Sequence, residues 1–456
     1  MRQYPVNIVG AGLAGALLAL MLARRGIAVT LYERRPDPRC SRAEGGRSIN
    51  LALAARGISA LEHAGVMDKV RPLMIPMRGR MIHDLDHAPA LLPYGQREHE
   101  VIYSVGRGAL NRLLIEEAAR HRNVTLRFEQ ACLTVDPAHD VMRIKDLDSQ
   151  RVYEARLAPT IATDGAGSAI RTSLASLGLI EEREDRLDHD YKELTIPARD
   201  GRWAIEPHAL HIWPRGGFML IALPNTDGSF TATLFLPKGG EHAPADMPSF
   251  ATLGDTASIQ SFFEREFPDA LALIPTLIDD FFEHRQGQLG AVQATPWHVD
   301  GKVLLLGDAA HAIVPFHGQG MNAAFEDCTV FDGLLTADPD WTQVFAEFET
   351  RRRPNTEAIA QMALENYTEM RHRVLDDKFL RQKSMALELE RQFPTRFIPR
   401  YSMVMFHPEI SYAEALRRGG VQQYILDALD ETTQSSGNLD VAHARTLIEA
   451  QLPSIK

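Results

Sequence analysis

The sequence predicts an α/β fold with three parts: a three-layer domain on a parallel sheet, a domain on an antiparallel sheet, and a C-terminal helical region. Three observations support this prediction. A short apolar strand at residues 6–9 runs directly into a glycine-rich turn and a helix. A second apolar strand, residues 303–306, ends at a Gly-Asp pair. Between them, residues 209–214, 218–223 and 230–236 have strand character.

Length and composition are those of a globular protein with two or three domains. The chain has 456 residues, of which 45% are hydrophobic and 24% charged. Its net charge of −11 argues against a general nucleic-acid binder, which would present a basic face. The three cysteines, Cys40, Cys132 and Cys328, are far apart, so neither a disulfide scaffold nor a zinc site is expected. We therefore expect a reducing, cytoplasmic location.

One apolar run near the N-terminus could suggest a membrane segment. Residues 8–23 are uncharged and mostly apolar, and Arg24 and Arg25 follow them. A signal peptide carries its positive charge before the apolar run, and a spanning helix needs about 20 residues. The C-terminal segment is too polar for an anchor, so no membrane association is expected.

The first 33 residues predict a Rossmann-like dinucleotide-binding unit. After the strand at 6–9, Gly10, Gly12 and Gly15 lead into a helix at 13–25, and a second strand ends at Glu33. In such a turn the glycines permit a tight bend, a close approach of pyrophosphate, and helix–strand packing. The helix N-terminus attracts phosphate, and the acid accepts hydrogen bonds from a ribose. This motif alone leaves both NAD and FAD open.

Two more motifs favour FAD. Residues 164–171 (DGAGSAIR) follow a predicted strand at 157–162, and Asp308 lies at the carboxyl end of the strand at 303–306, where open sheets bind ligands. A Gly318-Gln319-Gly320 loop then leads into a predicted helix at 322–335. Together the three segments resemble the flavoprotein aromatic hydroxylases, although Ala162-Thr163 stands where that family usually has Gly-Ala.

The resemblance implies a tightly bound, non-covalent FAD. It implies that Asp308 bonds a ribityl hydroxyl, that Arg107 touches the cofactor, and that the helix near Gly320 points at the flavin pyrimidine. The expected FAD contacts are Gly10, Gly12, Gly15, Glu33, Arg34, Ala52, Arg107, Cys132, Asp308, Gly320, Met321 and Asn322. Because no second glycine motif follows a strand, NADPH is expected as a transient co-substrate, and the sequence assigns its docking site to no residue.

Five further runs carry a closer resemblance, to the kynurenine 3-monooxygenase family, over residues 6 to about 405. They lie at residues 47–53, 77–81, 210–214, 362–367 and 394–403. The resemblance implies conversion of L-kynurenine and O2 to 3-hydroxy-L-kynurenine through a C4a-hydroperoxyflavin, in tryptophan breakdown or NAD synthesis. The flavin carries this chemistry, so no catalytic residue is assigned.

The same resemblance implies a substrate-binding set. Arg80 would pair with the amino-acid carboxylate, Tyr94 would be its hydroxyl partner, Asn366 and Tyr401 would close around the amino-acid end, and Phe316 would lie against the ring. Arginine supplies the two-pronged geometry that a carboxylate needs. By residue type alone, Arg80 would be a surface charge and the tyrosines packing residues.

His311 and His317 are spaced six residues apart with no carboxylate cluster nearby in the sequence, so no metal site is expected. We interpret His311 as a packing residue beside the flavin strand.

The domain boundaries follow from these motifs. We expect a discontinuous FAD-binding domain at 1–75, 95–180 and 287–345, a substrate-binding sheet domain at 76–94 and 181–286, and a C-terminal helical region at 346–456. Two alternatives stay open: a hydroxylase of the same class that acts on another aromatic acid, and a non-catalytic flavin-binding protein. The expected assembly is a monomer or a homodimer.

Overall fold

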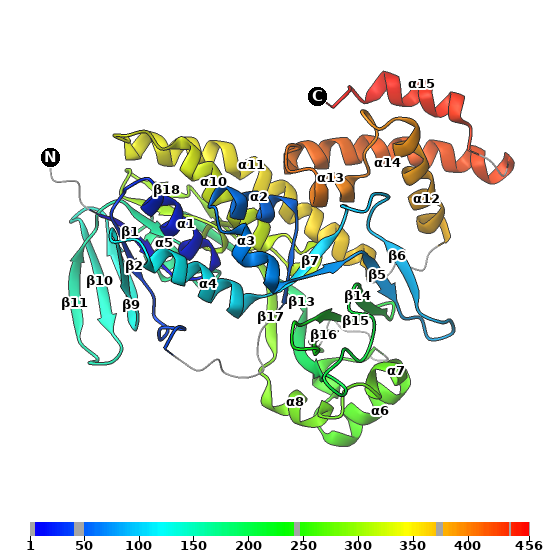
Figure 1. The fold of residues 1–456 in the computed structure, drawn as a ribbon, viewed down its shortest axis with the longest axis horizontal. Coiled ribbons are helices and arrows are strands. Elements are labelled where there is room, and N and C mark those ends of the chain that lie inside the picture. Colours follow the sequence, from blue (N-terminus) through cyan, green and yellow to red (C-terminus); the bar gives the residue numbers. More distant parts are fainter. Residues whose placement is uncertain (1–4, 41–49, 241–246, 371–376, 437–438, 456) are drawn as a thin grey trace. The chain divides into compact units, whose positions relative to one another are not determined.

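The computed structural model describes residues 5–40, 50–240, 247–370, 377–436 and 439–455 (Figure 1). The first three residues of the run at 47–53 lie outside them. The chain forms two compact units. Unit 1 comprises Met1–Met74, Val105–Arg186 and Gly290–Ala360, and unit 2 comprises Ile75–Ser104, Leu187–Leu289 and Gln361–Lys456. In this division the C-terminal helices fall in unit 2 with the antiparallel sheet, and the three-part boundaries expected from the sequence stay a prediction.

Unit 1 is built on a six-stranded sheet with the strand order β18-β19-β12-β1-β2-β8. Its strands are β1 (Val6–Val9), β2 (Val29–Tyr32), β8 (Val124–Arg127), β12 (Thr160–Ala162), β18 (His298–Val299) and β19 (Val303–Leu305). All pairs are parallel except β18 with β19. The strands predicted from the sequence form its centre, and the α/β fold class is confirmed.

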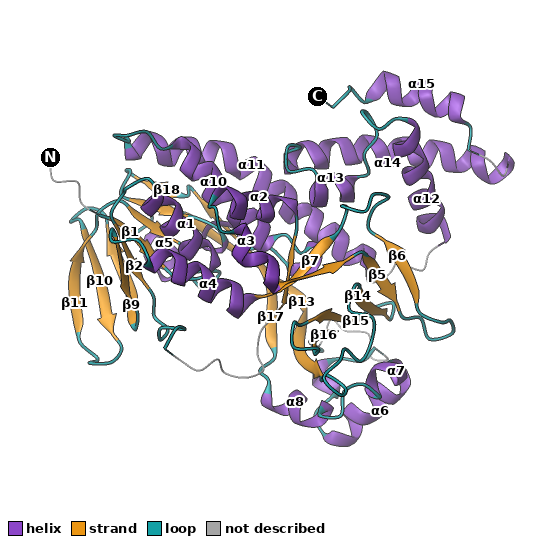
Figure 2. Cartoon of the chain, in the orientation of Figure 1, coloured by secondary structure: helices purple, strands orange, loops and turns teal. Residues whose placement is uncertain are grey.

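Unit 1 also contains helices and a small antiparallel sheet (Figure 2). The helices are α1 (Leu13–Arg24), α2 (Ala55–His63), α3 (Met67–Val70), α4 (Arg107–Ala119), α5 (Ala169–Ser176), α9 (Asp308–His311) and α10 (Gly320–Leu334), with the start of α11 (Trp341–Thr368). Helix α1 contacts both α4 and α10, and its residues from Gly15 to Ala23 are buried. Helix α5 packs on a three-stranded antiparallel sheet of β9 (Gln130–Asp136), β10 (Val141–Asp146) and β11 (Val152–Arg156). The short strand β3 (Asn50–Leu53) precedes α2.

Most of a seven-stranded sheet, β17-β13-β16-β15-β14-β5-β6, belongs to unit 2, while residues 181–186 of β13 and 290–295 of β17 belong to unit 1. Its strands are β5 (Gly79–Ile82), β6 (Ala90–Pro93), β13 (Glu181–Ile196), β14 (Leu210–Pro214), β15 (Met219–Pro224), β16 (Phe230–Pro237) and β17 (Gly287–Thr295). The expected antiparallel sheet is present, with one difference: β5 and β14 pair in parallel. The long strand β13 was not predicted, because its first six residues (EEREDR) are charged and exposed and show no apolar alternation. Strands β4 (Met74–Met77) and β7 (Ile102–Gly106) lie where the chain passes from one unit to the other.

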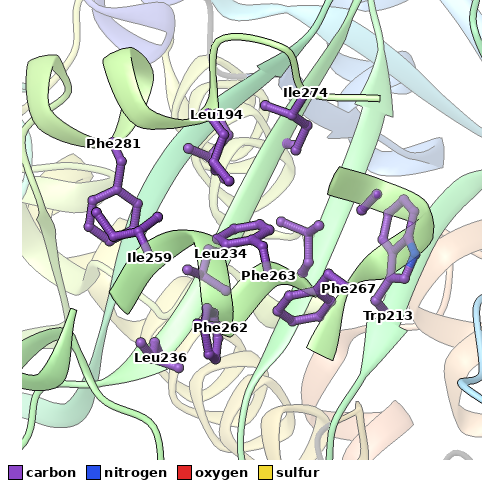
Figure 3. Close-up of a cluster of buried hydrophobic side chains, with 14 of the residues drawn as sticks. Leu194, Trp213, Leu234, Leu236, Ile259, Phe262, Phe263, Phe267, Ile274 and Phe281 are labelled. Atoms are coloured by element: carbon purple, nitrogen blue, oxygen red, sulfur yellow. The ribbon is translucent and has the colours of Figure 1, made fainter. Parts of the chain in front are cut away.

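The two faces of this sheet differ in burial. One face, with Leu194, Trp213, Leu220 and Leu234, packs under α6 (Thr256–Glu266), α7 (Pro268–Leu271) and α8 (Leu277–Glu283) in an aromatic core (Figure 3). Because side chains alternate along a strand, the register assigns the opposite face to a second set of residues. This set, here named the Arg80 face, is Arg80, Leu210, Ile212, Met219, Ile221, Thr233 and Phe235. Arg80 is therefore directed away from the core.

Four helices complete unit 2 after residue 376. They are α12 (Asp377–Gln392), α13 (Arg400–Phe406), α14 (Tyr412–Ser436) and α15 (Val441–Gln451). Met385, Leu389, Ile425 and Ile448 belong to one buried apolar cluster that joins α12, α14 and α15. Among the residues that the structure describes, no helix is both long enough and apolar enough to cross a membrane.

Two buried histidines tie β5 to β14 on the core face. His83 Nδ1 lies 2.9 Å from Asp269 Oδ2, His83 Nε2 lies 2.8 Å from His211 Nδ1, and His211 Nε2 lies 2.7 Å from the Glu206 carbonyl oxygen. Burial, with a contribution from His83, lowers the pKa of His211 to about 4.

This depressed pKa predicts an acid-dependent loss of stability. Since His211 titrates near 6.5 when unfolded, its stabilising contribution is fully present above that pH and is lost as pH falls toward 4, by about 3 kcal/mol. The measurement is the thermal unfolding midpoint between pH 7 and 4. We expect a His211→Asn variant to start with a lower midpoint and to lose less on acidification, while His87→Asn, at an exposed position, follows the unsubstituted protein. Parallel pH profiles for the His211→Asn variant and the unsubstituted protein would rule this origin out.

Candidate functional site

Two glycines in the first turn are required by internal packing. Gly10 has φ +102°, and a Cβ there would lie 2.5 Å from the Thr163 carbonyl oxygen. A Cβ on Gly15 would lie 1.9 Å from the Gly10 carbonyl oxygen. The Thr163 hydroxyl lies 2.8 Å from the Gly10 carbonyl oxygen and 3.1 Å from that of Val9. At this departure from the family pattern, the threonine therefore bonds to the glycine turn.

Gly12 is different, because no internal contact explains it. Its φ of −68° suits any residue, and a Cβ there would meet no atom within 4 Å. In the second turn Gly167 is equally open, whereas Gly165 has open space but a φ of +85°, which itself favours glycine. Between these turns and β12, Asp164 Oδ1 is buried without a hydrogen-bond partner among the described residues, and burial raises the pKa of this carboxyl. Open glycines beside an unsatisfied polar atom fit a bound group with phosphates and hydroxyls, as FAD has.

Glu33 at the end of β2 has capacity for a ligand. Its Oε2 accepts a hydrogen bond from the Ala11 backbone N–H at 2.8 Å, and its Oε1 accepts two from Arg35, from the backbone N–H at 2.9 Å and from Nε at 3.0 Å. An ionised carboxylate offers about four acceptor sites, so a ribose hydroxyl can still be accommodated. Arg34, next to it, is exposed.

Asp308 follows β19 as the first residue of α9, after Gly307 with φ 63°. Its side chain is exposed, yet protein surrounds it closely enough for burial to raise the pKa of the carboxyl, while His311 and Arg107 act in the opposite direction. Arg107, the first residue of α4, is also exposed. The structure therefore places Arg107 and Asp308 within electrostatic range of each other.

A buried ion network fixes this turn. Asp327 Oδ2 accepts the Gly307 N–H at 3.1 Å and lies 2.7 Å from His311 Nε2, while Asp327 Oδ1 accepts Arg352 Nε at 2.6 Å. Glu326 extends the network by binding both Arg352 and Arg56. His311 thus helps to position this turn, a more specific role than the packing that the sequence indicated. Asp327 is a contributor that the sequence reasoning missed.

The side chain of Asn322 is engaged with the protein backbone. Its Oδ1 accepts the Ala54 N–H at 2.9 Å, and its Nδ2 donates to the carbonyl oxygens of Ala52 and Gly318, each at 2.9 Å. Asn322 therefore joins β3 to the loop before α10 and can offer a ligand only its main chain. The first N–H groups of α10, from Gly320, Met321 and Asn322, have no partner within the helix, as at any helix start.

Two further predicted residues lie in unit 1. Cys132, on β9, is buried, and burial together with Asp164 raises the pKa of its thiol to about 12, which makes it unreactive. Phe316 is buried in the 3-10 turn Pro315–His317. All twelve predicted cofactor residues and Phe316 belong to unit 1.

The other four predicted substrate residues belong to unit 2, and three of them meet. The Arg80 guanidinium carbon lies 5.1 Å from the ring centre of Tyr401 and 6.0 Å from that of Tyr94, and the two rings stack at 5.6 Å. Burial by itself lowers the pKa of Arg80, but Tyr401, Tyr94 and Glu369 outweigh it and raise the pKa, so the guanidinium stays charged. Asn366, buried on α11, donates to Met370 Sδ at 3.4 Å.

The hydroxyl of Tyr94 is a candidate contact for a ligand. It is buried and has no hydrogen-bond partner among the described residues, although Arg80 and Tyr401 lie close enough to affect its pKa, which burial raises. A buried unsatisfied hydroxyl costs free energy that an acceptor on a ligand recovers.

The sequence reasoning did not identify two charged residues of this cluster. Glu369 Oε1 lies 3.7 Å from Arg80. Its position three residues after Asn366 on a helix was a signal that could have found it. Lys383 of α12 lies within electrostatic range of both Arg80 and Glu369. No motif in the sequence pointed to it.

Comparisons with known proteins identify the family. Residues 3–337 match the family model for the FAD binding domain, which confirms the expected cofactor class. A kynurenine 3-monooxygenase of Stenotrophomonas maltophilia (strain K279a) is 48% identical over 99% of this chain and 98% of its own. The chain belongs to the kynurenine 3-monooxygenase family. A second family member, from Xanthomonas oryzae pv. oryzae (strain MAFF 311018), is 47% identical over 98% of this chain and 97% of its own.

Solved structures with a similar fold are more distant in sequence. The tetrameric form of 2-methyl-3-hydroxypyridine-5-carboxylic acid oxygenase has a TM-score of 0.64 at 19% identity, and covers 82% of this chain and 94% of its own. PqsL of P. aeruginosa, in complex with 2-aminobenzoylacetate, has a TM-score of 0.63 at 21% identity, over 80% and 96% of the two chains. They confirm the predicted fold for this member of the kynurenine 3-monooxygenase family.

The openness around Gly12 gives a direct test of the cofactor site. We expect Gly12→Ala to lower FAD affinity tenfold or more while leaving the thermal midpoint of the FAD-free protein unchanged. The added methyl group would contact no protein atom and would occupy the space expected for the pyrophosphate. Titration of FAD-free protein by flavin fluorescence measures this. Gly333→Ala, where a Cβ is equally unhindered but outside the predicted cofactor contacts, is the matched control. Equal FAD affinity in the Gly12 variant would remove Gly12 from the site.

Proposed function

We propose that this chain is an FAD-dependent, NADPH-consuming monooxygenase that converts L-kynurenine to 3-hydroxy-L-kynurenine. The observation that carries this proposal is the 48% identity, over almost the full length, to a named kynurenine 3-monooxygenase. The structure adds support from physical chemistry, because the cluster around Arg80 suits the amino-acid end of this substrate.

The amino-acid end of kynurenine is a zwitterion, and unit 2 offers complementary charges. We assign the carboxylate to the Arg80 guanidinium and to the hydroxyl of Tyr94, which otherwise has no hydrogen-bond partner among the described residues. A planar guanidinium binds a carboxylate with two parallel hydrogen bonds. Glu369, 3.7 Å from Arg80 in the substrate-free protein, is the proposed acceptor for the ammonium group. Asn366 and Tyr401 complete the proposed set.

The aromatic end needs apolar walls. On the Arg80 face, Leu210 is paired directly with Arg80, and Ile221 and Phe235 follow on the next strands. Leu210 and Ile221 are only partly buried, whereas their neighbours on the core face, such as Trp213 and Leu220, are fully buried. We propose that these three side chains contact the aniline ring. Phe316, in unit 1, stays a proposed ring contact on the family resemblance alone.

Residues of unit 1 would hold FAD. The glycine turn and the N-terminus of α1 would bind its pyrophosphate, Glu33 would bind its adenosine ribose, and Asp308 would bind its ribityl chain. Bound FAD, once reduced by NADPH, supplies the activation of dioxygen that delivers one oxygen atom to the substrate ring. The protein groups bind, orient and exclude water. The ring amine already activates the adjacent carbon, so we assign no general base. All the proposed contacts come from one chain, which is compatible with a monomer or a homodimer.

A substitution at Arg80 tests the substrate assignment. We expect Arg80→Ala to raise the KM for L-kynurenine roughly a hundredfold with FAD still bound, because a charged, two-pronged contact is lost. Arg78→Ala, two residues earlier and exposed, is the matched control and should keep its KM. NADPH oxidation at varied kynurenine concentration, with the flavin spectrum recorded in parallel, is the measurement. An unchanged KM in the Arg80 variant would remove Arg80 from the site.

The reaction itself is tested by NADPH oxidation with and without L-kynurenine, followed by mass analysis of the product. The proposal predicts strong stimulation and a product with one added oxygen at the 3-position. Stimulation by another aromatic acid but not by kynurenine would establish the alternative of a hydroxylase with a different substrate. Bound flavin without stimulation by any aromatic acid would favour a non-catalytic flavin-binding protein.

A further inference from the structure

Lys383 belongs to a charged cluster, but it forms no ion pair with the residues that the structure describes. Helix α12, which carries it, belongs to unit 2 together with Arg80, Glu369, Tyr94 and Tyr401. Neighbouring basic residues on the helix form ion pairs: Lys378 with Asp427 at 2.9 Å, and Arg381 with Asp430 at 3.2 Å. For Lys383, no hydrogen bond or ion pair is found among the described residues, although its side chain is half-buried. Such a cation is stabilised by a nearby anion, and the described carboxylate within its electrostatic range, Glu369, is shared with Arg80.

The face of α12 that carries Lys383 is directed at the segment containing Tyr94. In a helix, residues 383, 387 and 390 lie along one side. The Leu387 carbonyl oxygen accepts a hydrogen bond from Gln96 Nε2 at 2.8 Å, and Glu390 Oε2 accepts one from the same amide at 3.0 Å. The four residues from Lys383 to Leu387 span about 6 Å of helix. Lys383 therefore lies one helical turn from Leu387, which contacts Gln96. Gln96 follows Tyr94 by two residues in the sequence.

The opposite sides of α12 are occupied by other contacts. Gln382 donates to Asp427 of α14 at 2.9 Å. Met385 and Leu389 lie in the apolar cluster shared with α14 and α15. These contacts occupy the neighbouring sides of α12, and the charged groups within electrostatic range of Lys383 are Arg80 and Glu369.

The charges of the cluster do not balance without a ligand. Arg80 and Lys383 are two cations, and Glu369, 3.7 Å from Arg80, is the carboxylate that accompanies them. Tyr94 and Tyr401 are neutral phenols, since burial raises the pKa of both hydroxyls. Farther along the same face of α12, Glu390 lies 3.4 Å from Arg97, which also pairs with Glu100, and burial raises the pKa of Glu390.

We propose that Lys383 is a second carboxylate-binding residue, whose ammonium group contacts the substrate carboxylate together with Arg80 and so sets the preference for amino-acid over decarboxylated substrates. This inference rests on the proposed function and deepens it. The ligand class is an α-amino acid with an aromatic side chain. Arg80 and Lys383 bind its carboxylate, and Glu369 binds its ammonium group.

A pH dependence of substrate binding follows. Burial, helped by the positive charge of Arg80, lowers the pKa of Lys383 to about 8, although Glu369 acts in the opposite direction. Below that pH the amine is protonated and binds the carboxylate, and above it the contact is lost. The KM for L-kynurenine should therefore rise as pH increases through 8, beyond any rise caused by the substrate's own amine.

The test compares the FAD-loaded protein with three variants. Lys383→Met removes the charge and keeps the length of the side chain, Lys383→Arg fixes the charge at all working pH values, and Lys378→Met is the matched control on the same helix. The readout is KM and kcat for L-kynurenine from pH 6.5 to 9, with the affinity for kynuramine, the decarboxylated analogue, measured by competition.

We expect Lys383→Met to raise the KM roughly tenfold or more at pH 7, with kcat nearly unchanged and no effect on kynuramine affinity, since a charge-assisted hydrogen bond to the carboxylate is lost. Lys383→Arg should keep a low KM and lack the additional rise above pH 8, and Lys378→Met should match the unsubstituted protein. Equal weakening of kynurenine and kynuramine by Lys383→Met, or an unchanged KM, would overturn the inference. If kynurenine fails to stimulate the unsubstituted protein at any pH, the proposed function falls, and this inference with it.

Discussion

The buried carboxylate of Asp327 is the contact on which the cofactor side of this protein depends. It accepts the Gly307 N–H, pairs with His311 and binds Arg352, and through these three contacts it fixes the turn that presents Asp308. Burial alone would raise the pKa of Asp327, but His311 and Arg352 hold it below its usual value, so the charge persists in the interior. Leaving one member of such a buried pair uncompensated costs about 3–5 kcal/mol. The position of Asp308 is therefore set by electrostatics within unit 1, before any ligand binds.

Strand register fixes the orientation of Arg80 on the substrate side. Along β5 and β14, alternate side chains enter the aromatic core or the Arg80 face, and a slip by one residue would exchange the two sets. The His83–His211 contact on the core face, with Trp213 stacked on His83 at 4.0 Å, holds the two strands in this register. Arg80 can then be buried among tyrosines, because the cost of burying its charge is offset by Glu369 and by the aromatic rings.

The sequence predicted what depends on local pattern. Strands β1, β2 and β19 and the glycine turn were predicted within one or two residues, because apolar runs and glycine spacing are local signals. The resemblance to a family brought Arg80, Tyr94 and Tyr401 together before any geometry was available, and the structure places these three side by side in unit 2. Strand β13 was missed because its charged start hides the alternation. Asp327 was missed because its partners lie 16 to 25 residues away in the chain. Lys383 was missed because no motif includes it.

The proposed reaction inserts one atom of dioxygen into kynurenine at the carbon next to the ring amine. The most direct measurement is isotope labelling: FAD-loaded protein, NADPH and L-kynurenine are incubated under ¹⁸O₂, and the product is examined by mass spectrometry and NMR. The account predicts a single ¹⁸O at the 3-position, and no label when ordinary dioxygen is used in H₂¹⁸O. Unaltered kynurenine after complete NADPH oxidation, or a hydroxyl group derived from water, would contradict it.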